Sequence, residues 1–266
     1  MDHSLLEMSA SARTWGELWG DRARDWAGNE EQQLPVYESA LRRVPIGPGD
    51  RVLDVGCGTG VFLRLAADLG AEVTGLDASE NLLAVARGRA PEAALHHGDL
   101  QSLPFPDGAF DLVTGFTSFF FADDMTAALR EAGRVADPGG HVVIEVFGAP
   151  ERCEIERVKS AIAPFRLRGA DGEEVRYWRP GMVAELAASA GLQVVDAFTC
   201  TTAYEYADEE RFLRAMLSAG GAARVAGPER EPALRAALVE AMAGCRRPDG
   251  GYRVSNEWEL VIARPA

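Results

Sequence analysis

Residues 52–60, VLDVGCGTG, decide the fold. An apolar run suited to a buried strand contains Asp54 and continues into three alternating glycines, Gly56, Gly58 and Gly60. A dinucleotide site requires G-x-G-x-x-G between a strand and a helix, so that pyrophosphate meets the helix N-terminus. Here the third glycine comes one residue early, and the carboxylate of Asp54 would repel a diphosphate. The stretch therefore predicts a ligand that carries ammonium or sulfonium charge.

Strand and helix patterns alternate around this stretch. Short apolar runs predict five strands, at residues 51–56, 71–77, 93–99, 110–116 and 141–148. Apolar residues at helical spacing predict three helices between them, at 61–70, 79–90 and 124–136. Such alternation is typical of a parallel sheet covered by helices on both faces. We therefore expect an α/β fold.

Two further aspartates end the next two predicted strands. Asp77 can accept hydrogen bonds from both hydroxyls of a ribose, as in nucleotide-binding folds. Asp99 can accept from the adenine amino group, while the backbone N–H of Leu100 faces the ring. In open α/β sheets ligands bind at the carboxyl ends of the strands, so these acids would lie together. They suit S-adenosylmethionine, an adenosine with no phosphate and two cationic centres, with Asp54 near its methionine ammonium.

Five motifs together resemble a known family. VLDVGCGTG, VTGLDAS, GDLQSLPF, FDLVTGF and LREAGRVADPGGHVVIEVFG are similar to the successive motifs of the class I (Rossmann-like) S-adenosylmethionine-dependent methyltransferases, most of all to the small-molecule branch. The resemblance covers residues 35–148. It implies a seven-stranded sheet in the order 3-2-1-4-5-7-6 with strand 7 antiparallel. LQVVDAFTC and NEWELVIAR would then be the sixth and seventh strands.

The resemblance also implies which residues contact the cofactor. The three glycines of the loop would line its methionine part, and the backbone of Phe116 would contact its amino group. Asp77 and Ala78 would meet the ribose and adenine. Asp99 and Leu100 would meet adenine.

Residues 1–34 precede the strand and helix alternation. Trp15, Trp19 and Trp26 recur there at spacings of four and seven, so one helical face could carry all three. This segment resembles the family's lead-in helix, which folds over the cofactor. Trp19 would then contact the cofactor, and Arg22 would reach its methionine carboxylate. The alternative is a helix that only packs on the edge of the sheet.

The rest of the chain adds to one domain that spans residues 1–266. Helices are predicted at 151–165, 179–191, 208–217 and 231–245, and strands at 192–206 and 253–264. We expect residues 149–178 and 206–250 to be helical lid insertions over the substrate.

Composition excludes several classes of function. The formal net charge is −14, whereas a nucleic-acid-binding protein needs a basic surface, and anionic membranes are disfavoured for the same reason. The four cysteines are far apart, so neither a metal site nor a disulfide framework is expected. The first twenty residues contain no continuous apolar segment. We expect a soluble cytoplasmic protein, either a monomer or a homodimer.

Methyl transfer from a sulfonium mainly requires alignment of the reacting groups and exclusion of water. Glu145, late in the fifth strand, is the candidate catalytic base, and the alternative is a buried acid paired with an arginine. Aromatic residues near the strand ends, Phe119–121 and Phe147, together with Tyr177 and Trp178 in the first insertion, indicate an apolar lid.

These features predict methylation of a small, partly hydrophobic acceptor at O, N or C, in specialised metabolism, with S-adenosylhomocysteine as the product. Three alternatives stay open. The first is an S-adenosylmethionine-binding enzyme of the same fold that catalyses a non-methylating reaction. The others are a non-catalytic binding protein and a methyltransferase for protein side chains.

Overall fold

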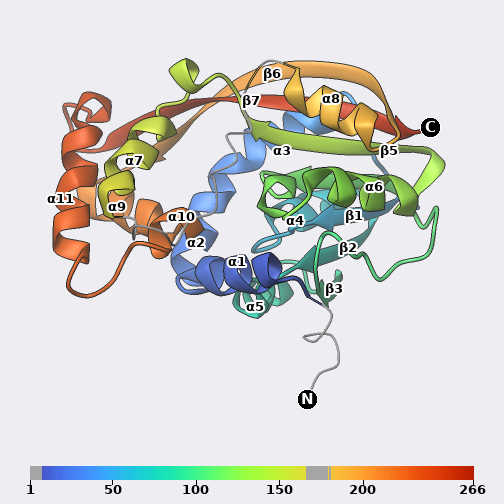
Figure 1. Cartoon of the computed structure of the whole chain (residues 1–266), viewed down its shortest axis with the longest axis horizontal. Coiled ribbons are helices and arrows are strands. Elements are labelled where there is room, and N and C mark those ends of the chain that lie inside the picture. Colours follow the sequence, from blue (N-terminus) through green and yellow to red (C-terminus); the bar gives the residue numbers. More distant parts are fainter. Residues whose placement is uncertain (1–7, 166–178, 180) are drawn as a thin grey trace.

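The computed structural model describes residues 8–165, 179 and 181–266 and contains one seven-stranded sheet (Figure 1). Its strand order, β3-β2-β1-β4-β5-β7-β6, confirms the predicted one. The last strand, β7, is antiparallel to both of its neighbours, and the other pairs are parallel. The strands are β1 (Arg51–Val55), β2 (Glu72–Asp77), β3 (Ala94–His97), β4 (Phe110–Phe116), β5 (Ala136–Phe147), β6 (Leu192–Tyr206) and β7 (Tyr252–Pro265).

Helices cover both faces of the sheet, as the alternation predicts. They are α1 (Ala10–Gly20), α2 (Ala23–Glu30), α3 (Leu34–Leu41), α4 (Val61–Asp68), α5 (Glu80–Arg89), α6 (Met125–Val135), α7 (Ile155–Ile162), α8 (Met182–Ser189), α9 (Glu209–Ser218), α10 (Gly220–Ala223) and α11 (Glu231–Ala241). One apolar core lies between the sheet and α6 with α8, and a second lies on the opposite face with α3 and α4. Within the described ranges, no helix is both long and apolar enough to cross a bilayer.

The predicted start of the fifth strand is wrong by five residues, because β5 begins at Ala136 and not at His141. The Pro138-Gly139-Gly140 turn signal lies inside the strand, where the register between β4 and β5 is irregular. Ala136 pairs with Phe110, and pairing resumes at His141 with Leu112. Extra residues in one strand of a pair are accommodated as a bulge, so the glycines bend β5 and do not end it.

The N-terminal segment forms several short helices, so the three tryptophans do not share one helix. The chain bends at Arg22 (φ −126°, ψ 42°), between α1 and α2. Trp19 in α1 and Trp26 in α2 meet across this bend edge to face, with ring centroids 4.7 Å apart. The 3-10 turn η2 (Glu31–Gln33) joins α2 to α3. The segment thus folds back on itself over the carboxyl edge of the sheet.

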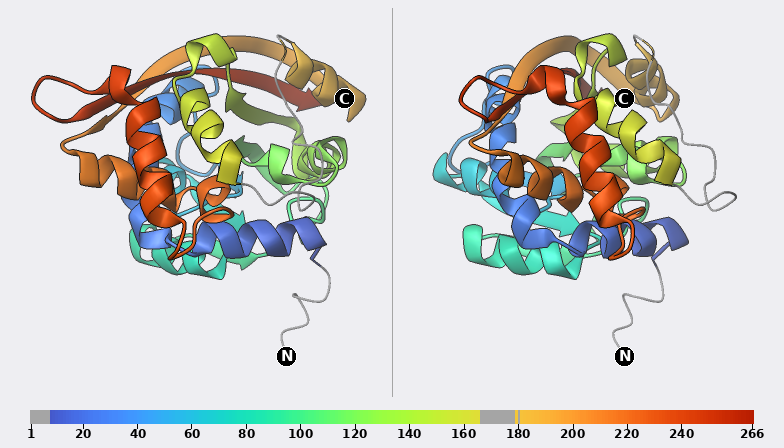
Figure 2. Two further views of the ribbon diagram at one scale, coloured as in Figure 1. Left: turned by 60° about the vertical axis from the view of Figure 1, so that its left-hand side comes forward. Right: turned by 90° about the vertical axis from the view of Figure 1, so that its left-hand side faces the viewer.

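A two-stranded ribbon extends beyond the sheet. Pairing between β5 and β7 ends at Phe147 with Trp258, whereas β6 and β7 stay paired as far as Tyr206 with Tyr252. Helices α7, α9, α10 and α11 gather around this extension, and α9 and α10 contact α2 and α1 (Figures 1 and 2). Part of the first expected insertion, residues 166–178, lies outside the described residues with Tyr177 and Trp178, as do residues 1–7 and 180.

Candidate functional site

All six backbone N–H groups of the loop at residues 56–61 donate to acceptors within the protein. Gly56 and Cys57 donate to the carbonyl of Leu76 (2.7 and 3.0 Å), Gly58 to Oδ2 of Asp77 (2.9 Å), Thr59 to Oε2 of Glu30 (2.8 Å), Gly60 to the carbonyl of Cys57 (2.9 Å), and Val61 to Oε1 of Glu30 (3.4 Å). In a dinucleotide site such groups face a pyrophosphate. Here a phosphate would meet the carboxylates of Asp77 and Glu30, and none of these six N–H groups is free to donate to it. The loop therefore disfavours phosphate binding.

Glu30 is a site residue that sequence reasoning missed. Its side chain, at the end of α2, is only 5% exposed and also accepts from Oγ1 of Thr59 at 2.9 Å. Burial raises the pKa of Glu30, although hydrogen bonds from Thr59 and Val61 oppose the rise. A Cβ on Gly58 would lie 2.7 Å from Oε2 of Glu30, so only glycine permits this approach. Because Glu30 is 29 residues away from Thr59 in sequence, no local pattern indicates the contact.

Asp54 lies in β1 beneath the loop and is 3% exposed. Oγ1 of Thr114, on the neighbouring β4, donates to Oδ1 of Asp54 at 2.7 Å. Burial, with a smaller contribution from the nearby charges of Glu30 and Asp77, raises the pKa of Asp54 to about 7 against this hydrogen bond. A buried acid of this kind favours a cation as its partner.

Asp77 ends β2 and organises the loops on either side of it. Its Oδ2 accepts from the backbone N–H of Gly58 at 2.9 Å and its Oδ1 from that of Ser79 at 2.8 Å. Burial raises the pKa of Asp77 to about 6, while these two hydrogen bonds lower it. No arginine or lysine in the described part of the chain forms an ion pair with Asp54 or Asp77. Asp54 and Asp77 therefore form a negative pair with no arginine or lysine partner among the described residues. Arg89, which hydrogen-bonds to Thr59 in the loop, instead opposes the rise that burial causes in the pKa of Glu30.

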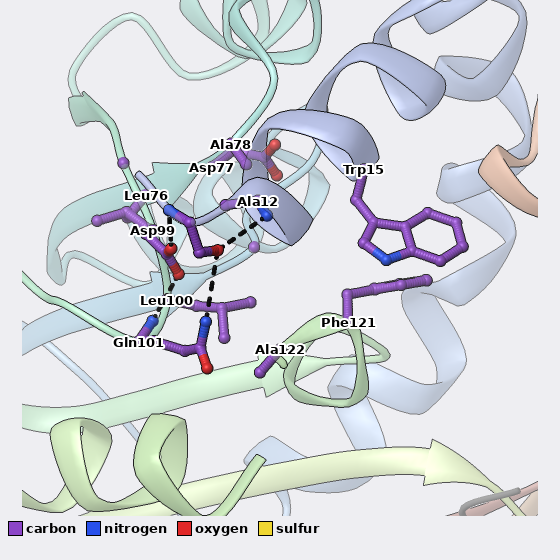
Figure 3. A pocket seen from close by; sticks show the side chains of 13 residues that line it. Ala12, Trp15, Leu76, Asp77, Ala78, Asp99, Leu100, Gln101, Phe121 and Ala122 are labelled. Atoms are coloured by element: carbon purple, nitrogen blue, oxygen red, sulfur yellow. Dashed lines mark hydrogen bonds between the residues drawn. The ribbon is translucent and has the colours of Figure 1, made fainter. Parts of the chain in front are cut away.

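A small cavity of about 40 Å³ lies beside these carboxylates (Figure 3). It is lined by Ser9, Ala12, Trp15, Gly56, Leu76, Asp77, Ala78, Gly98, Asp99, Leu100, Gln101, Phe121 and Ala122. One ordered water needs roughly 10–15 Å³ by this kind of measure, so the space suffices for a few waters and not for an adenosyl group. The α1 helix closes the cavity from above, and a ligand of that size requires α1 to shift.

The contacts of α1 explain how the cavity is closed. The backbone N–H of Ser9 donates to Oδ2 of Asp99 at 2.9 Å, and Oδ1 of Asp99 accepts from the N–H of Gln101 at 2.9 Å. A Cβ on Gly16 would lie 2.1 Å from the carbonyl oxygen of Ala78. The lead-in helix therefore packs directly on the loop after β2.

The structure brings most of the predicted cofactor residues to this edge of the sheet. Gly56, Asp77, Ala78, Asp99 and Leu100 line the cavity. Asp54, Gly58 and Gly60 form the adjoining strand end and loop, and the ring of Phe116, which ends β4, packs 4.5 Å from that of Tyr37. Their roles toward a cofactor stay predictions.

Arg22 and Trp19 have other partners in this structure. Nη2 of Arg22 lies 2.6 Å from Oε2 of Glu231 in α11. Trp19 packs against Trp26 and Phe121, and its buried indole N–H has no hydrogen-bond partner among the described residues. Contact of Arg22 with a methionine carboxylate would require the ion pair with Glu231 to break.

Glu145, late in β5, is 1% exposed, and neither of its carboxylate oxygens has a hydrogen-bond partner among the described residues. Burial raises its pKa to about 8, and the nearby backbone N–H of Thr117 opposes this rise. No arginine from the described ranges pairs with it, so the paired-acid alternative finds no support here. The group is a buried acid poised to exchange a proton near neutral pH.

Comparisons with known proteins agree with the geometry. Residues 53–144 match the family described as "Methyltransferase domain". The malonyl-[acyl-carrier protein] O-methyltransferase of Serratia marcescens is 40% identical over 125 residues, which are 46% of this chain and 48% of that protein. The 27-O-demethylrifamycin SV methyltransferase of Amycolatopsis mediterranei (strain S699) is 31% identical over 183 residues, 64% of this chain and 61% of that one.

The chain spans about half the length of the first of these curated relatives. Among solved structures, the [4+2]-cyclase SpnF superposes with a TM-score of 0.56 at 22% identity, covering 87% of this chain and 80% of that one. At this identity the likeness concerns the fold alone.

Proposed function

Since the chain belongs to the class I (Rossmann-like) S-adenosylmethionine-dependent methyltransferases, we propose that it methylates a small, partly hydrophobic acceptor. The family's cofactor is S-adenosylmethionine, and the product would be S-adenosylhomocysteine. The observation that carries the proposal is the pair of buried carboxylates, Asp54 and Asp77, which have no arginine or lysine partner among the described residues and lie at a glycine loop whose N–H groups are all occupied. A positively charged adenosyl donor suits this site, and a phosphate does not.

The residues present fit this cofactor. In the proposal, Asp77 and Ala78 hold the ribose and adenine, and Asp99 and Leu100 hold the adenine edge. Asp54, the three glycines and the backbone of Phe116 hold the methionine part. When bound, S-adenosylmethionine supplies an electrophilic methyl group on a cationic sulfur.

The chain's own residues supply alignment and exclusion of water. The α1 helix packs on the loop after β2 and leaves only the small cavity, so its closure would shield the reacting groups. Helices α7, α9, α10 and α11 lie over the same edge of the sheet and support the proposed role of residues 149–178 and 206–250 as a substrate lid (Figure 2). The four free cysteines support a cytoplasmic location, which is part of the proposal.

A calorimetric comparison of cofactors tests the proposal. We expect S-adenosylmethionine and S-adenosylhomocysteine to bind the full chain, and NAD to show no binding, because its pyrophosphate meets Glu30 and Asp77. Formation of S-adenosylhomocysteine in a turnover assay would distinguish methyl transfer from a non-methylating reaction on the same fold. Binding of NAD in preference to S-adenosylmethionine would refute the proposal.

Cofactor affinity should rise with pH. The pKa values of Asp54 and Asp77 in the folded chain, about 7 and about 6, lie above the ordinary value of 3.8. A cation binds their ionised forms, so affinity for S-adenosylmethionine should increase between pH 5.5 and 8, by up to about tenfold per pH unit where one proton is linked to binding. Titration calorimetry over this range measures the slope, and we expect Asp54→Asn to flatten its upper part.

The same shifts affect the stability of the ligand-free chain in the opposite sense. A carboxyl group whose pKa is raised by folding contributes stability that is present below its unfolded pKa and is lost as pH rises through its folded pKa. Asp54 and Asp77 should therefore lower the free energy of unfolding as pH rises from their ordinary pKa of 3.8 to about 7 and about 6, respectively. A pH-independent cofactor affinity in the parent chain would contradict the first expectation, and a free energy of unfolding that does not fall over this range, measured by chemical denaturation, would contradict the second.

A further inference from the structure

Three buried oxygen atoms have no hydrogen-bond donor among the residues that the structure describes. They are both carboxylate oxygens of Glu145 and Oε1 of Gln33, in residues that are 1% and 4% exposed. Buried polar groups are almost always paired, and an unpaired one costs roughly 1–3 kcal/mol. Acceptors left without donors in a closed fold indicate that a donor-bearing group belongs among them.

Helical spacing puts Gln33 on the same face of the α2–η2–α3 segment as Glu30 and Tyr37. Glu30, Gln33 and Tyr37 are three and four residues apart on this run of helical turns, and all are buried. Glu30 contacts the glycine loop through Thr59, and Tyr37 packs its ring against that of Phe116. Gln33 therefore lies between the glycine loop and the end of β4.

Glu145 approaches the same place from the sheet. It is the direct partner of Phe116 in the β4–β5 pairing. Glu30, Asp54 and Glu145 are near enough to Tyr37 for their charges to raise the pKa of its hydroxyl, after burial as the main cause. Glu145 and Tyr37 thus lie close together beside Phe116, and Gln33 shares the helical face of Tyr37 one turn earlier.

The surroundings of this region are aromatic. Tyr37 and Tyr204 are buried there, and the charge of Glu145 also raises the pKa of the Tyr204 hydroxyl, after burial and the neighbouring Tyr206. Further along the same face, Phe147 packs on Trp258 with ring centroids 4.6 Å apart. Lys159 of α7 lies over the ring of Phe147 and is paired with Glu156.

We propose that Glu145 and Gln33 form a subsite for the amino group of the methyl acceptor, so that the chain is an N-methyltransferase of a small aromatic or aliphatic amine. This inference rests on the proposed function. An alkylammonium group carries three N–H donors, which match three oxygen acceptors, whereas a hydroxyl carries one. Aromatic walls bind the apolar part of such a molecule, and a carboxylate-bearing acceptor would be repelled.

The proposed methyl transfer conserves atoms and charge with Glu145 as the proton acceptor. The ammonium form of the acceptor gives one proton to the carboxylate of Glu145, which leaves a neutral amine with a free lone pair. The amine nitrogen forms a bond to the methyl carbon as the bond from that carbon to sulfur breaks, and the electron pair stays on sulfur. The products are a methylated ammonium and neutral S-adenosylhomocysteine. Burial, which raises the pKa of Glu145 to about 8, allows the group to hold this proton.

The test compares matched amines and alcohols as ligands of the full chain saturated with S-adenosylhomocysteine. The probes are 2-phenylethylamine with 2-phenylethanol, hexylamine with 1-hexanol, and cyclohexylamine with cyclohexanol, measured by titration calorimetry. We expect at least one amine to bind about tenfold more tightly than its alcohol. Glu145→Gln should remove that preference, while the affinity for S-adenosylhomocysteine changes less than about twofold.

Two further variants complete the design. Gln33→Leu, which removes the amide acceptor at similar volume, should weaken the amine about threefold. Glu257→Gln is the matched control, because Glu257 is also a buried acid, on β7, but is paired with Arg152 at 2.8 Å. It should leave the amine preference unchanged. Circular dichroism and thermal unfolding confirm that each variant is folded.

Three results would overturn the subsite. Alcohols could bind as tightly as amines, no amine could bind, or Glu145→Gln could weaken S-adenosylhomocysteine as much as the amine. The last result would assign Glu145 to the methionine ammonium of the cofactor. Failure of the proposed function looks different, since the parent chain would then bind neither S-adenosylmethionine nor S-adenosylhomocysteine.

Discussion

The Asp77→Ala variant is expected to bind S-adenosylmethionine about a hundredfold more weakly than the parent chain, a loss of about 3 kcal/mol. Two effects combine. The carboxylate that would accept from the ribose hydroxyls is gone, and the N–H groups of Gly58 and Ser79 lose the acceptor that fixes both loops. Titration calorimetry measures the loss directly.

The fold should survive this change, because an acid buried without a cation stabilises the ligand-free chain little at neutral pH. Asp77→Asn, which keeps the shape and one acceptor oxygen, should lose less affinity than Asp77→Ala. Asp107→Ala removes an exposed aspartate paired with Arg134, away from the cavity, and serves as the control. Parent-like binding by Asp77→Ala would show that the ribose position is wrongly assigned.

Gly58→Val should abolish measurable cofactor binding. The backbone of Gly58 has a φ of +54°, in the left-handed region that a β-branched residue adopts only at a cost of roughly 1–2 kcal/mol or more. The Cβ of the new valine would lie 2.7 Å from Oε2 of Glu30. The carboxylate of Glu30 would then have to move away from the N–H groups of Thr59 and Val61. The loop would then lose the conformation that contacts the cofactor.

Calorimetry up to millimolar cofactor and a thermal unfolding curve measure this variant together. Gly47→Val is the matched control, since a Cβ on Gly47 meets no atom within 4 Å. We expect the control to bind like the parent chain. If Gly58→Val is folded and also binds like the parent chain, residues 56–60 do not form the cofactor loop.

The positions of the first five strands along the chain could be predicted because each strand is a short local pattern between turn and cap signals, whereas their order in the sheet was indicated by the family resemblance. The three aspartates could be assigned to one edge for the same reason, since Asp54, Asp77 and Asp99 each lie at or near the carboxyl end of a parallel strand. The reversed direction of β7 depends on tertiary pairing with β5 and β6, and only the family resemblance indicated it.

Other features depend on contacts between distant parts of the chain and left no local pattern. Glu30 reaches the glycine loop only because α2 folds back over it, and Ser9 reaches Asp99 across 90 residues of sequence. The early start of β5 was missed because Pro138 and two glycines are normally turn signals, whereas here the pairing of Ala136 with Phe110 outweighs them. Features of this kind can be identified only from the folded structure.

The antiparallel direction of β7 has a practical consequence for handling the protein. Its final residues pair with the start of β6 near the amino edge of the sheet, where Ala263 also lies opposite Val142. A linker, dye or immobilisation tag joined after Ala266 would therefore leave the cavity accessible. The same attachment ahead of Ser9 would add bulk next to α1, the helix that must move for ligand entry. C-terminal fusions are therefore the better choice for binding assays.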